Sequence, residues 1–173
     1  MKRSVKSSKA NHKNALRGRS VSVSRTEMVE VVLPQDANPF GNILGGRVMH
    51  LIDIAGGIAT YRHCHGLAVT ASVDHLDFLN PIRVGELIVL ESQVNRAFTT
   101  SVEVGVEVFS ENYVTGERKH TTTAFLTFVA IDESGNPSLV PPLIPKTHEE
   151  RRRYREAGER RKARVAARTR RTN

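Results

Sequence analysis

The sequence predicts an α+β fold in which an antiparallel sheet curls around one long central helix. Two observations lead to this prediction. A single helical stretch covers residues 43–63, and it follows one short Val-rich segment that is typical of a strand. Four strand-like segments then follow with only short turns between them, an order that is typical of an α+β domain with an antiparallel sheet.

The expected elements follow one another without internal repeats. The first strand covers residues 26–33, and a polar loop with two prolines, residues 34–41, separates it from the helix. The later strands are expected at residues 68–78, 86–95, 100–110 and 118–131. Turn residues join them, such as the Ser-Gly-Asn of residues 134–136. Alternating Val and Glu from Val102 to Val108 indicate that one face of the sheet meets a core.

The expected helix has two contrasting faces. One apolar stripe, predicted to face the sheet, contains Leu44, Val48, Leu51, Ala55 and Ile58. The opposite strip is made mostly of small residues and contains Gly46, Met49, Asp53, Gly56, Gly57 and Thr60. Each glycine inside a helix costs about 0.5–1 kcal/mol relative to Ala. We therefore expect a second subunit or a ligand to approach this strip closely, near the carboxylate of Asp53.

The net charge of +8 is unevenly distributed along the chain. Residues 1–25 carry eight Lys or Arg and no acid, residues 26–145 have a net charge of −8, and residues 146–173 again have +8. We expect a disordered basic N-terminal tail, because residues 1–25 have too few bulky apolar side chains to offset the entropy of ordering. Residues 26–145 are expected to form the folded domain. The Arg-rich C-terminal tail, residues 146–173, could form a solvated helix, but it lacks an apolar stripe that would dock it.

Basic tails could bind nucleic acid or anionic lipid through phosphate contacts. The two tails hold only one aromatic side chain for base stacking, Tyr154, which favours a solubilising or tethering role. The chain has no apolar run long enough to cross a bilayer and no secretory signal, so we expect an intracellular, cytoplasmic protein. The Arg- and Ser-rich N-terminus also has the composition of an organelle transit peptide, and this alternative stays open.

Neither a metal nor a cofactor is expected. The single cysteine, Cys64, excludes an internal disulfide and a CxxC-type zinc site, and we expect it to be a half-buried helical thiol. His63, His65 and His75 do not form a convincing metal site, because the first two are two positions apart at a helix end and do not face the same side.

A pair of glycines, Gly45 and Gly46, stands where the helix is expected to begin. The unpaired N–H groups and the positive dipole end at such a place can stabilise an oxyanion. Asp53 follows about 11 Å further along the helix. A thioester could lie between them, with its carbonyl oxygen at the glycine N–H groups and Asp53 attacking or activating water. A structural role for Asp53, bonded to the backbone or paired with an arginine, is equally open at this point.

Several short motifs in this order resemble the acyl-CoA thioesterases of the hot-dog superfamily, the branch that includes short bacterial acyl-CoA hydrolases and the two-domain brain acyl-CoA hydrolase. The motifs are Asp36-Ala37-Asn38, Gly41-Asn42, Gly45-Gly46, Leu51-Ile52-Asp53, Ala55-Gly56, Val69-Thr70-Ala71-Ser72-Val73-Asp74 with Phe78, Pro81-Ile82 with Gly85, and Phe128-Val129-Ala130-Ile131-Asp132. The resemblance covers roughly residues 27–133 and rests on the order and spacing of the motifs together. The two basic tails match nothing in the family pattern.

The resemblance implies a hot-dog fold and a set of functional residues. It assigns the catalytic aspartate to Asp53, the catalytic asparagine to Asn38 and the oxyanion donor to Gly45, with Gly46 as its neighbour. Thr70 falls at a strand position that lines such sites. The implied reaction is hydrolysis of acyl-CoA to a free fatty acid and coenzyme A, with Asp53 as general base or nucleophile.

The resemblance also implies that the active site forms across a homodimer interface, so that Asn38 comes from the partner subunit, and that three dimers assemble into a hexamer. Arg83 and Arg62 are the candidates for holding the phosphates of coenzyme A. Asn42, directly before the helix, is interpreted as its N-cap.

Two rival functions remain open at this stage. A hot-dog hydratase or dehydratase acting on acyl thioesters would need a histidine and a carboxylate for proton transfer at carbon. Alternatively, a non-catalytic core could sense acyl-CoA while the basic tails engage nucleic acid or a membrane.

Overall fold

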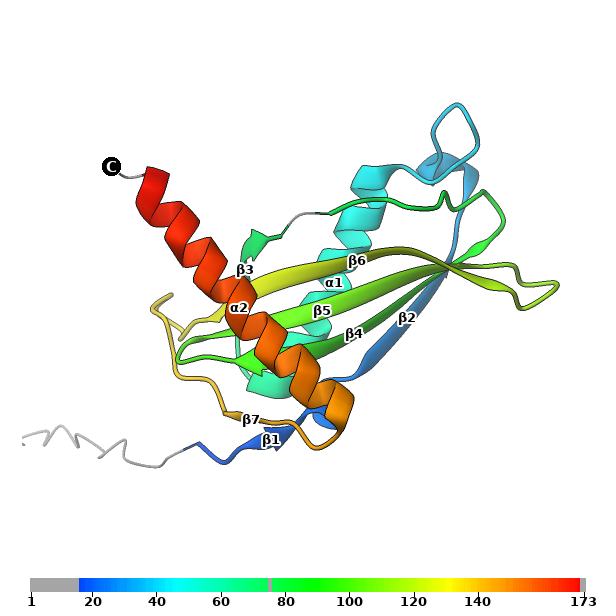
Figure 1. Ribbon diagram of the computed structural model, residues 1–173. Coiled ribbons are helices and arrows are strands. Elements are labelled where there is room, and N and C mark those ends of the chain that lie inside the picture. The colour runs from blue at the N-terminus through cyan, green and yellow to red at the C-terminus, as the bar shows by residue number, and fades with distance from the viewer. Residues whose placement is uncertain (1–15, 75, 172–173) are drawn as a thin grey trace, which may run out of the picture.

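A computed structural model describes residues 16–74 and 76–171 (Figure 1). The main elements are α1 (Gly45–Cys64), α2 (His148–Arg171), β2 (Thr26–Val31), β3 (Ala68–Val73), β4 (Leu87–Ala97), β5 (Ser101–Glu111) and β6 (Arg118–Ala130). Short elements complete the order, namely β1 (Arg19–Ser20), the 3-10 turns η1 (Val21–Val23) and η2 (Pro34–Asp36), and β7 (Leu143–Ile144). None of the described helices is both long and apolar enough to cross a membrane.

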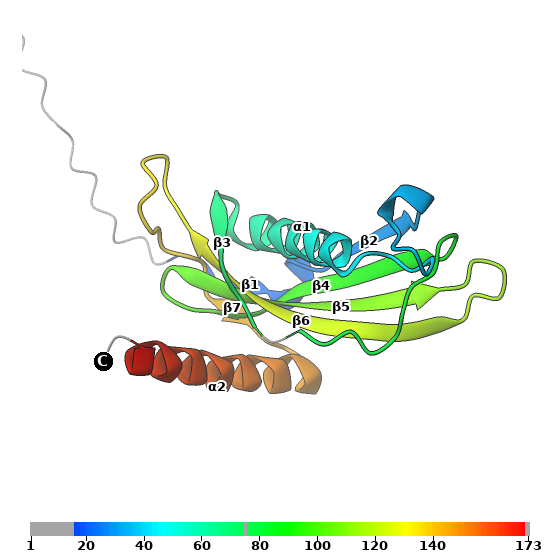
Figure 2. The same cartoon turned by 90° about the horizontal axis from the view of Figure 1, so that it is seen from above.

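Five strands form one antiparallel sheet in the order β2-β4-β5-β6-β3. Helix α1 covers one face of this sheet and helix α2 covers the other, so the molecule has three layers (Figure 2). The predicted α+β class, with a sheet wrapped around one long helix, is confirmed. The strands at the two edges are β2 and β3, and each is hydrogen-bonded within this sheet on one side.

Helix α1 packs on the sheet through a stripe close to the predicted one. Val48, Leu51 and Ala55 are buried as expected. Leu44, however, is 45% exposed, and the buried stripe continues through Ile52, Ala59, Thr60 and His63 instead. The predicted stripe was therefore rotated slightly around the helix axis from the observed one. The prediction gave weight to the large side chains Leu44 and Ile58 and not to the small Ala59.

The close approach expected at the glycine strip is made in part by the chain itself. A Cβ atom placed at Gly56 would lie 3.0 Å from the ring of Phe128 on β6. Gly56 therefore lets α1 settle onto an aromatic side chain of the sheet. A ligand or a second subunit is not needed to explain this glycine, which corrects the expectation from the sequence.

Residues 16–25 are folded, so the prediction of disorder for residues 1–25 is wrong for this part; residues 1–15 lie outside the described residues. Strand β1 pairs in parallel with β7, and Val21 is only 2% exposed. The hydroxyl of Ser24 accepts a hydrogen bond from the Val94 N–H group, 3.0 Å away. The prediction gave too much weight to the positive charge of residues 1–25. It overlooked the Val21-Ser22-Val23 segment, which anchors residues 16–25 to the domain.

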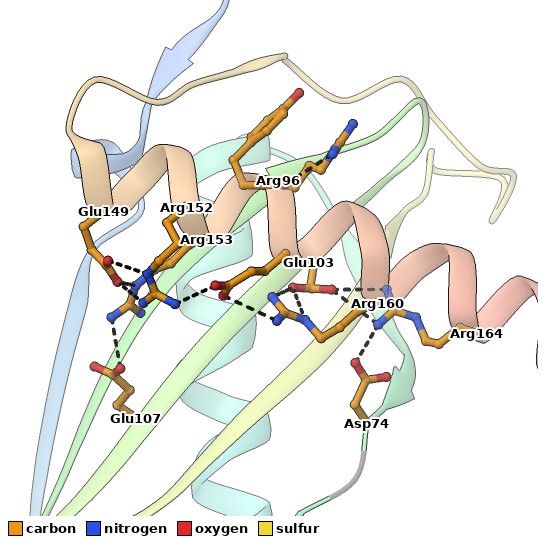
Figure 3. Close-up of polar contacts among 11 residues, drawn as sticks. Asp74, Arg96, Glu103, Glu107, Glu149, Arg152, Arg153, Arg160 and Arg164 are labelled. Carbon is orange, nitrogen blue, oxygen red and sulfur yellow. Dashed lines mark hydrogen bonds and ion pairs between the residues drawn. The ribbon is translucent and has the colours of Figure 1, made fainter.

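Helix α2 packs across the outer face of the sheet, although its sequence has no apolar stripe (Figure 3). Ion pairs replace the stripe. The carboxylate of Glu103, which is fully buried, binds Arg160 at 2.7 Å and Arg164 at 3.3 Å, and Arg153 binds Glu107 at 3.0 Å. The positive C-terminal segment and the negative domain thus neutralise one another where they meet.

Close approach and cation–π contacts add to the α2 interface. Ala157 is fully buried against the sheet. The guanidinium of Arg160 lies 3.6 Å from the ring centroid of Phe125, and that of Arg96 lies 4.3 Å from the ring centroid of Tyr154. Such contacts are worth about 0.5–2 kcal/mol each, depending on how far they are shielded from water.

Candidate active site

Asp53 and Thr70 meet on the open side of α1. The Thr70 hydroxyl donates a hydrogen bond of 2.6 Å to Asp53 Oδ1, and both residues are exposed. Thr70 reaches this place because it pairs with Phe128 on β6, whose ring lies beneath Gly56 of α1. The second carboxylate oxygen, Oδ2, has no hydrogen-bond or ion-pair partner among the residues that the structure describes. It is free to act on a substrate or on water.

Asn38 is locked in a tight turn that fixes the orientation of its side-chain amide. Its Oδ1 accepts hydrogen bonds from the N–H groups of Phe40, at 3.0 Å, and Asn42, at 3.2 Å. Gly41, with a φ of +75°, closes the turn and donates its N–H to the Asn38 carbonyl. Because two N–H donors point at Oδ1, the amide nitrogen must point away from them. Asn38 can therefore offer a donor, and not an acceptor, to a bound molecule.

Helix α1 begins at Gly45 without a side-chain cap. The N-cap residue is Leu44, so the interpretation of Asn42 as the cap is wrong; Asn42 instead serves the turn that holds Asn38. The N–H groups of Gly45 and Gly46 are exposed and have no partner among residues 16–74 and 76–171. With no acidic residue in the first turn, these groups and the helix dipole favour a negative oxygen.

A cavity of about 340 Å³ opens beside these groups. Its polar lining includes Asn38, Asn42, Asn80 and Thr121, and its apolar lining includes Ile43, Gly45, Val48, Phe78, Leu79, Pro81 and Ile82. The Leu79 N–H donates to the Thr121 carbonyl at 2.8 Å, which attaches the wall to β6. A strand was expected through Phe78, but β3 ends at Val73, and the segment after it forms this wall. The large apolar pair Phe78-Leu79 followed by Asn80-Pro81 was a usable signal for it.

One chain does not bring Asn38 and Asp53 together. Asn38 and Gly45 line the cavity, whereas Asp53 does not, and the eight-residue separation of Gly45 and Asp53 along α1 corresponds to about 12 Å. The chain therefore presents two half-sites. One consists of Asn38 with the first N–H groups of α1, and the other consists of Asp53 with Thr70.

The half-site with Asp53 lies on a surface suited to a partner. Met49 and Val73 are each about half exposed there, and Val73 belongs to the edge strand β3. Exposed apolar side chains beside an unpaired strand edge are typical of an association surface. A second copy of the chain placed here could join the two kinds of half-site.

The two arginines proposed for coenzyme A differ in their surroundings. Arg83 is exposed next to Asn42, with which it forms an isolated bridge, and its guanidinium has no partner among the described residues. Arg62 lies at the other end of α1, where its Nη1 donates to the Arg25 carbonyl at 2.6 Å and to the Thr26 hydroxyl at 3.0 Å. Its guanidinium is engaged in holding α1 to the beginning of β2.

His63 and Cys64, near the end of α1, serve the fold. His63 is buried, its Nε2 lies 2.8 Å from the Pro141 carbonyl, and burial lowers its pKa below the ordinary value of 6.5. Cys64 is half-buried as predicted, and burial raises the pKa of its thiol to about 11. No group of potential metal ligands is found among the described residues, while His75 lies outside them.

Known proteins resemble this chain in sequence and in structure. Residues 40–117 match the Thioesterase superfamily. The acyl-CoA thioester hydrolase YkhA of Bacillus subtilis is 45% identical over 119 residues, which are 69% of each protein. A hexameric acyl-CoA thioesterase, solved in its apo form, has a TM-score of 0.85 and 42% identity, with 88% of this chain and 97% of that chain covered.

An acyl-CoA hydrolase of Staphylococcus aureus, solved with butyryl coenzyme A and coenzyme A, has a TM-score of 0.83 and 33% identity, with 89% of this chain and 94% of that chain covered. Structures of that enzyme with an aspartate, an asparagine or a threonine replaced by alanine are similar as well. In that enzyme the asparagine stands fifteen positions before the aspartate, and the threonine stands seventeen after it.

The fold and the two half-sites define a thioesterase of the hot-dog type. The chain belongs to the hot-dog acyl-CoA thioesterase family, as the identity and coverage of its relatives show.

Proposed function

We propose that this protein hydrolyses acyl-CoA thioesters to a free acid and coenzyme A. The observation that carries the proposal is the Asp53 carboxylate, which Thr70 holds by one oxygen on an exposed face while the other oxygen stays free. The S. aureus hydrolase supports the assignment, because Asn38, Asp53 and Thr70 have the same residue types and the same spacing as the three residues replaced there.

The minimal active unit in this proposal is a homodimer. Asn38 and Gly45 of one subunit would face Asp53 of the other, because one chain keeps the two half-sites apart. We further propose that three such dimers assemble into a hexamer, because a similar acyl-CoA thioesterase is hexameric. The Arg83 guanidinium, exposed and without a partner among the described residues, is the better candidate for the phosphates of coenzyme A.

Each group has one part in the proposed reaction. The thioester carbonyl oxygen accepts from the Gly45 N–H, from Gly46 as its neighbour, and from Asn38 Nδ2, so that negative charge developing on it is stabilised. Asp53 either removes a proton from water as the water attacks the carbonyl carbon or attacks the carbon itself. In both routes the carbon–sulfur bond breaks, and coenzyme A leaves as a thiolate that takes up a proton. The second route adds hydrolysis of an acyl–Asp53 anhydride by water.

The proposed hydrolysis is tested by measuring thiol release from acyl-CoA with a colorimetric trap. We expect Asp53→Asn to lower kcat about 10²-fold or more without unfolding the protein, as is typical for loss of a general base or nucleophile. Glu117→Gln, which alters an exposed carboxylate far along the sheet, is the matched control. A wild-type rate in pure Asp53→Asn would refute the assignment. A single turnover in ¹⁸O-water tests for the second route, since label enters Asp53 only when water attacks the aspartyl carbonyl of an anhydride.

A further inference from the structure

Strand β3 connects the site to helix α2, because it presents side chains to both faces of the sheet. Thr70 lies opposite Phe128 and points toward α1, where it binds Asp53. Asp74, whose N–H donates to the Phe125 carbonyl at 2.9 Å, points toward α2. There it binds Arg164 at 2.6 Å (Figure 3). One short segment thus holds the proposed catalytic carboxylate on one side and an arginine of the C-terminal helix on the other.

A β-bulge makes this two-sided connection possible. Residues four apart in a regular strand lie on the same face of a sheet. The pairing of β3 with β6 shifts between Thr70 and Ser72, so that Ala71 is an extra residue and the alternation reverses. Bulges commonly re-aim side chains beside active sites. Without the extra residue, Asp74 and Thr70 would both face α1, and Arg164 could not reach Asp74.

Arg164 is itself held firmly. It is 19% exposed, and its second partner is the fully buried Glu103 of β5, at 3.3 Å. Asp74 is similarly shielded, at 18% exposed. Ion pairs that are partly removed from water are screened less than exposed ones, so this pair can fix the position of a strand end. It does so on an edge strand, where the sheet supports β3 from one side.

We propose that Arg164 is a positioning residue for the thioesterase site. By holding Asp74, it sets the path of β3 and so keeps the Thr70 hydroxyl on Asp53. This inference rests on the proposed function, in which Asp53 does the chemistry. The C-terminal helix thereby takes part in activity without touching the substrate.

The test compares two arginines of the same helix. Arg164→Ala removes the ion pair to Asp74 at the end of β3 together with the longer contact to Glu103. The control, Arg153→Ala, removes an ion pair to Glu107 on β5 together with one to Glu149. We expect Arg164→Ala to lower kcat about threefold to tenfold with a smaller change in KM, and Arg153→Ala to stay within about twofold of wild type. Asp74→Asn should reproduce the effect of Arg164→Ala, and it serves in its place if that variant fails to fold.

A double-mutant cycle shows whether the effect passes through Thr70. If it does, Arg164→Ala lowers kcat in the wild-type protein but has almost no further effect in Thr70→Ala. An equal loss in both backgrounds, or equal rates for Arg164→Ala and Arg153→Ala, overturns the proposal.

Hydrogen exchange provides a readout that does not depend on turnover. The amides of Ala68–Val73 should exchange faster in Arg164→Ala than in Arg153→Ala, and equal protection overturns the inference. An inactive wild-type protein would overturn the proposed function alone.

Discussion

The Thr70 hydroxyl lies 2.6 Å from Asp53 Oδ1 and joins an edge strand to the central helix at the point where the chemistry is proposed. Hydroxyl donors to a carboxylate form short, strong hydrogen bonds that fix the orientation of the acceptor. The contact therefore determines which oxygen of Asp53 is available to a substrate.

Replacing Thr70 tests this orientation. Thr70→Ala should lower kcat about tenfold, because a hydrogen bond to a charged group is lost. Thr70→Ser should recover most of the rate, since the hydroxyl remains, and Thr70→Val, which keeps the shape without the hydroxyl, should behave as Thr70→Ala. Initial rates of thiol release over a range of acyl-CoA concentrations measure these effects. Equal rates in the Ser and Val variants would exclude a hydrogen-bonding role.

Mixing two inactive variants tests the sharing of the site between subunits. Asp53→Ala and Asn38→Ala should each be nearly inactive alone. In a mixed dimer one of the two sites receives both an intact Asp53 and an intact Asn38, so co-expression should restore about a quarter of the wild-type activity. The control mixes the two proteins after separate purification without subunit exchange. If co-expression restores no activity, the two residues act within one chain.

The buried Glu103 carboxylate supports a prediction about stability. Glu103→Ala leaves Arg160 and Arg164 without their shared partner, and removal of one member of a buried ion pair typically costs about 3–5 kcal/mol. Denaturant unfolding should show this loss as a lower midpoint. Glu117→Ala, which removes an exposed pair with Lys119, should change the free energy of unfolding by less than about 1 kcal/mol. Similar midpoints for the two variants would contradict the ion-pair description of the α2 interface.

Burial of His63 predicts a pH dependence of stability. Burial lowers the pKa of His63, so the unfolded chain binds a proton near pH 6.5 that the folded chain does not. Stability should therefore fall as the pH drops below about 6.5 and should stop falling, for this residue, at the lower pKa of the folded state. Melting temperatures at pH 7.5 and 5.5 measure the difference. The difference in melting temperature between the two pH values should be smaller in His63→Phe than in wild type. In His50→Gln, which changes an exposed position, it should equal that of wild type.

The sequence predicted the parts of the fold that depend on local periodicity. The long helix and the strands β4, β5 and β6 were confirmed within two residues, because apolar side chains repeat at helical and strand spacing there. The strand expected at residues 68–78 was too long, since β3 ends at Val73. The bulge at Ala71 could not be predicted, since its only sign is a shift in pairing with a strand more than fifty residues away. The docking of α2 was missed for a similar reason: its contacts join charges such as Arg160 and Glu103 that are remote in sequence.

The site was predictable only in its components. Gly45, Gly46 and Asp53 could be placed on a helix by periodicity, and Asn38 and Thr70 came from the family resemblance. The donor orientation of the Asn38 amide could not be predicted, because it depends on two backbone N–H groups of the following turn.

The docking of α2 changes how the terminal segments of this protein should be removed in experiments. A cut before residue 16 takes away only residues outside the described fold. A cut at residue 146 would also remove the arginines that hold Asp74, Glu103 and Glu107, and the outer face of the sheet would then be uncovered, with these acids left without counterions. Loss of activity after such a truncation would report a damaged sheet and would say little about what the basic segment binds.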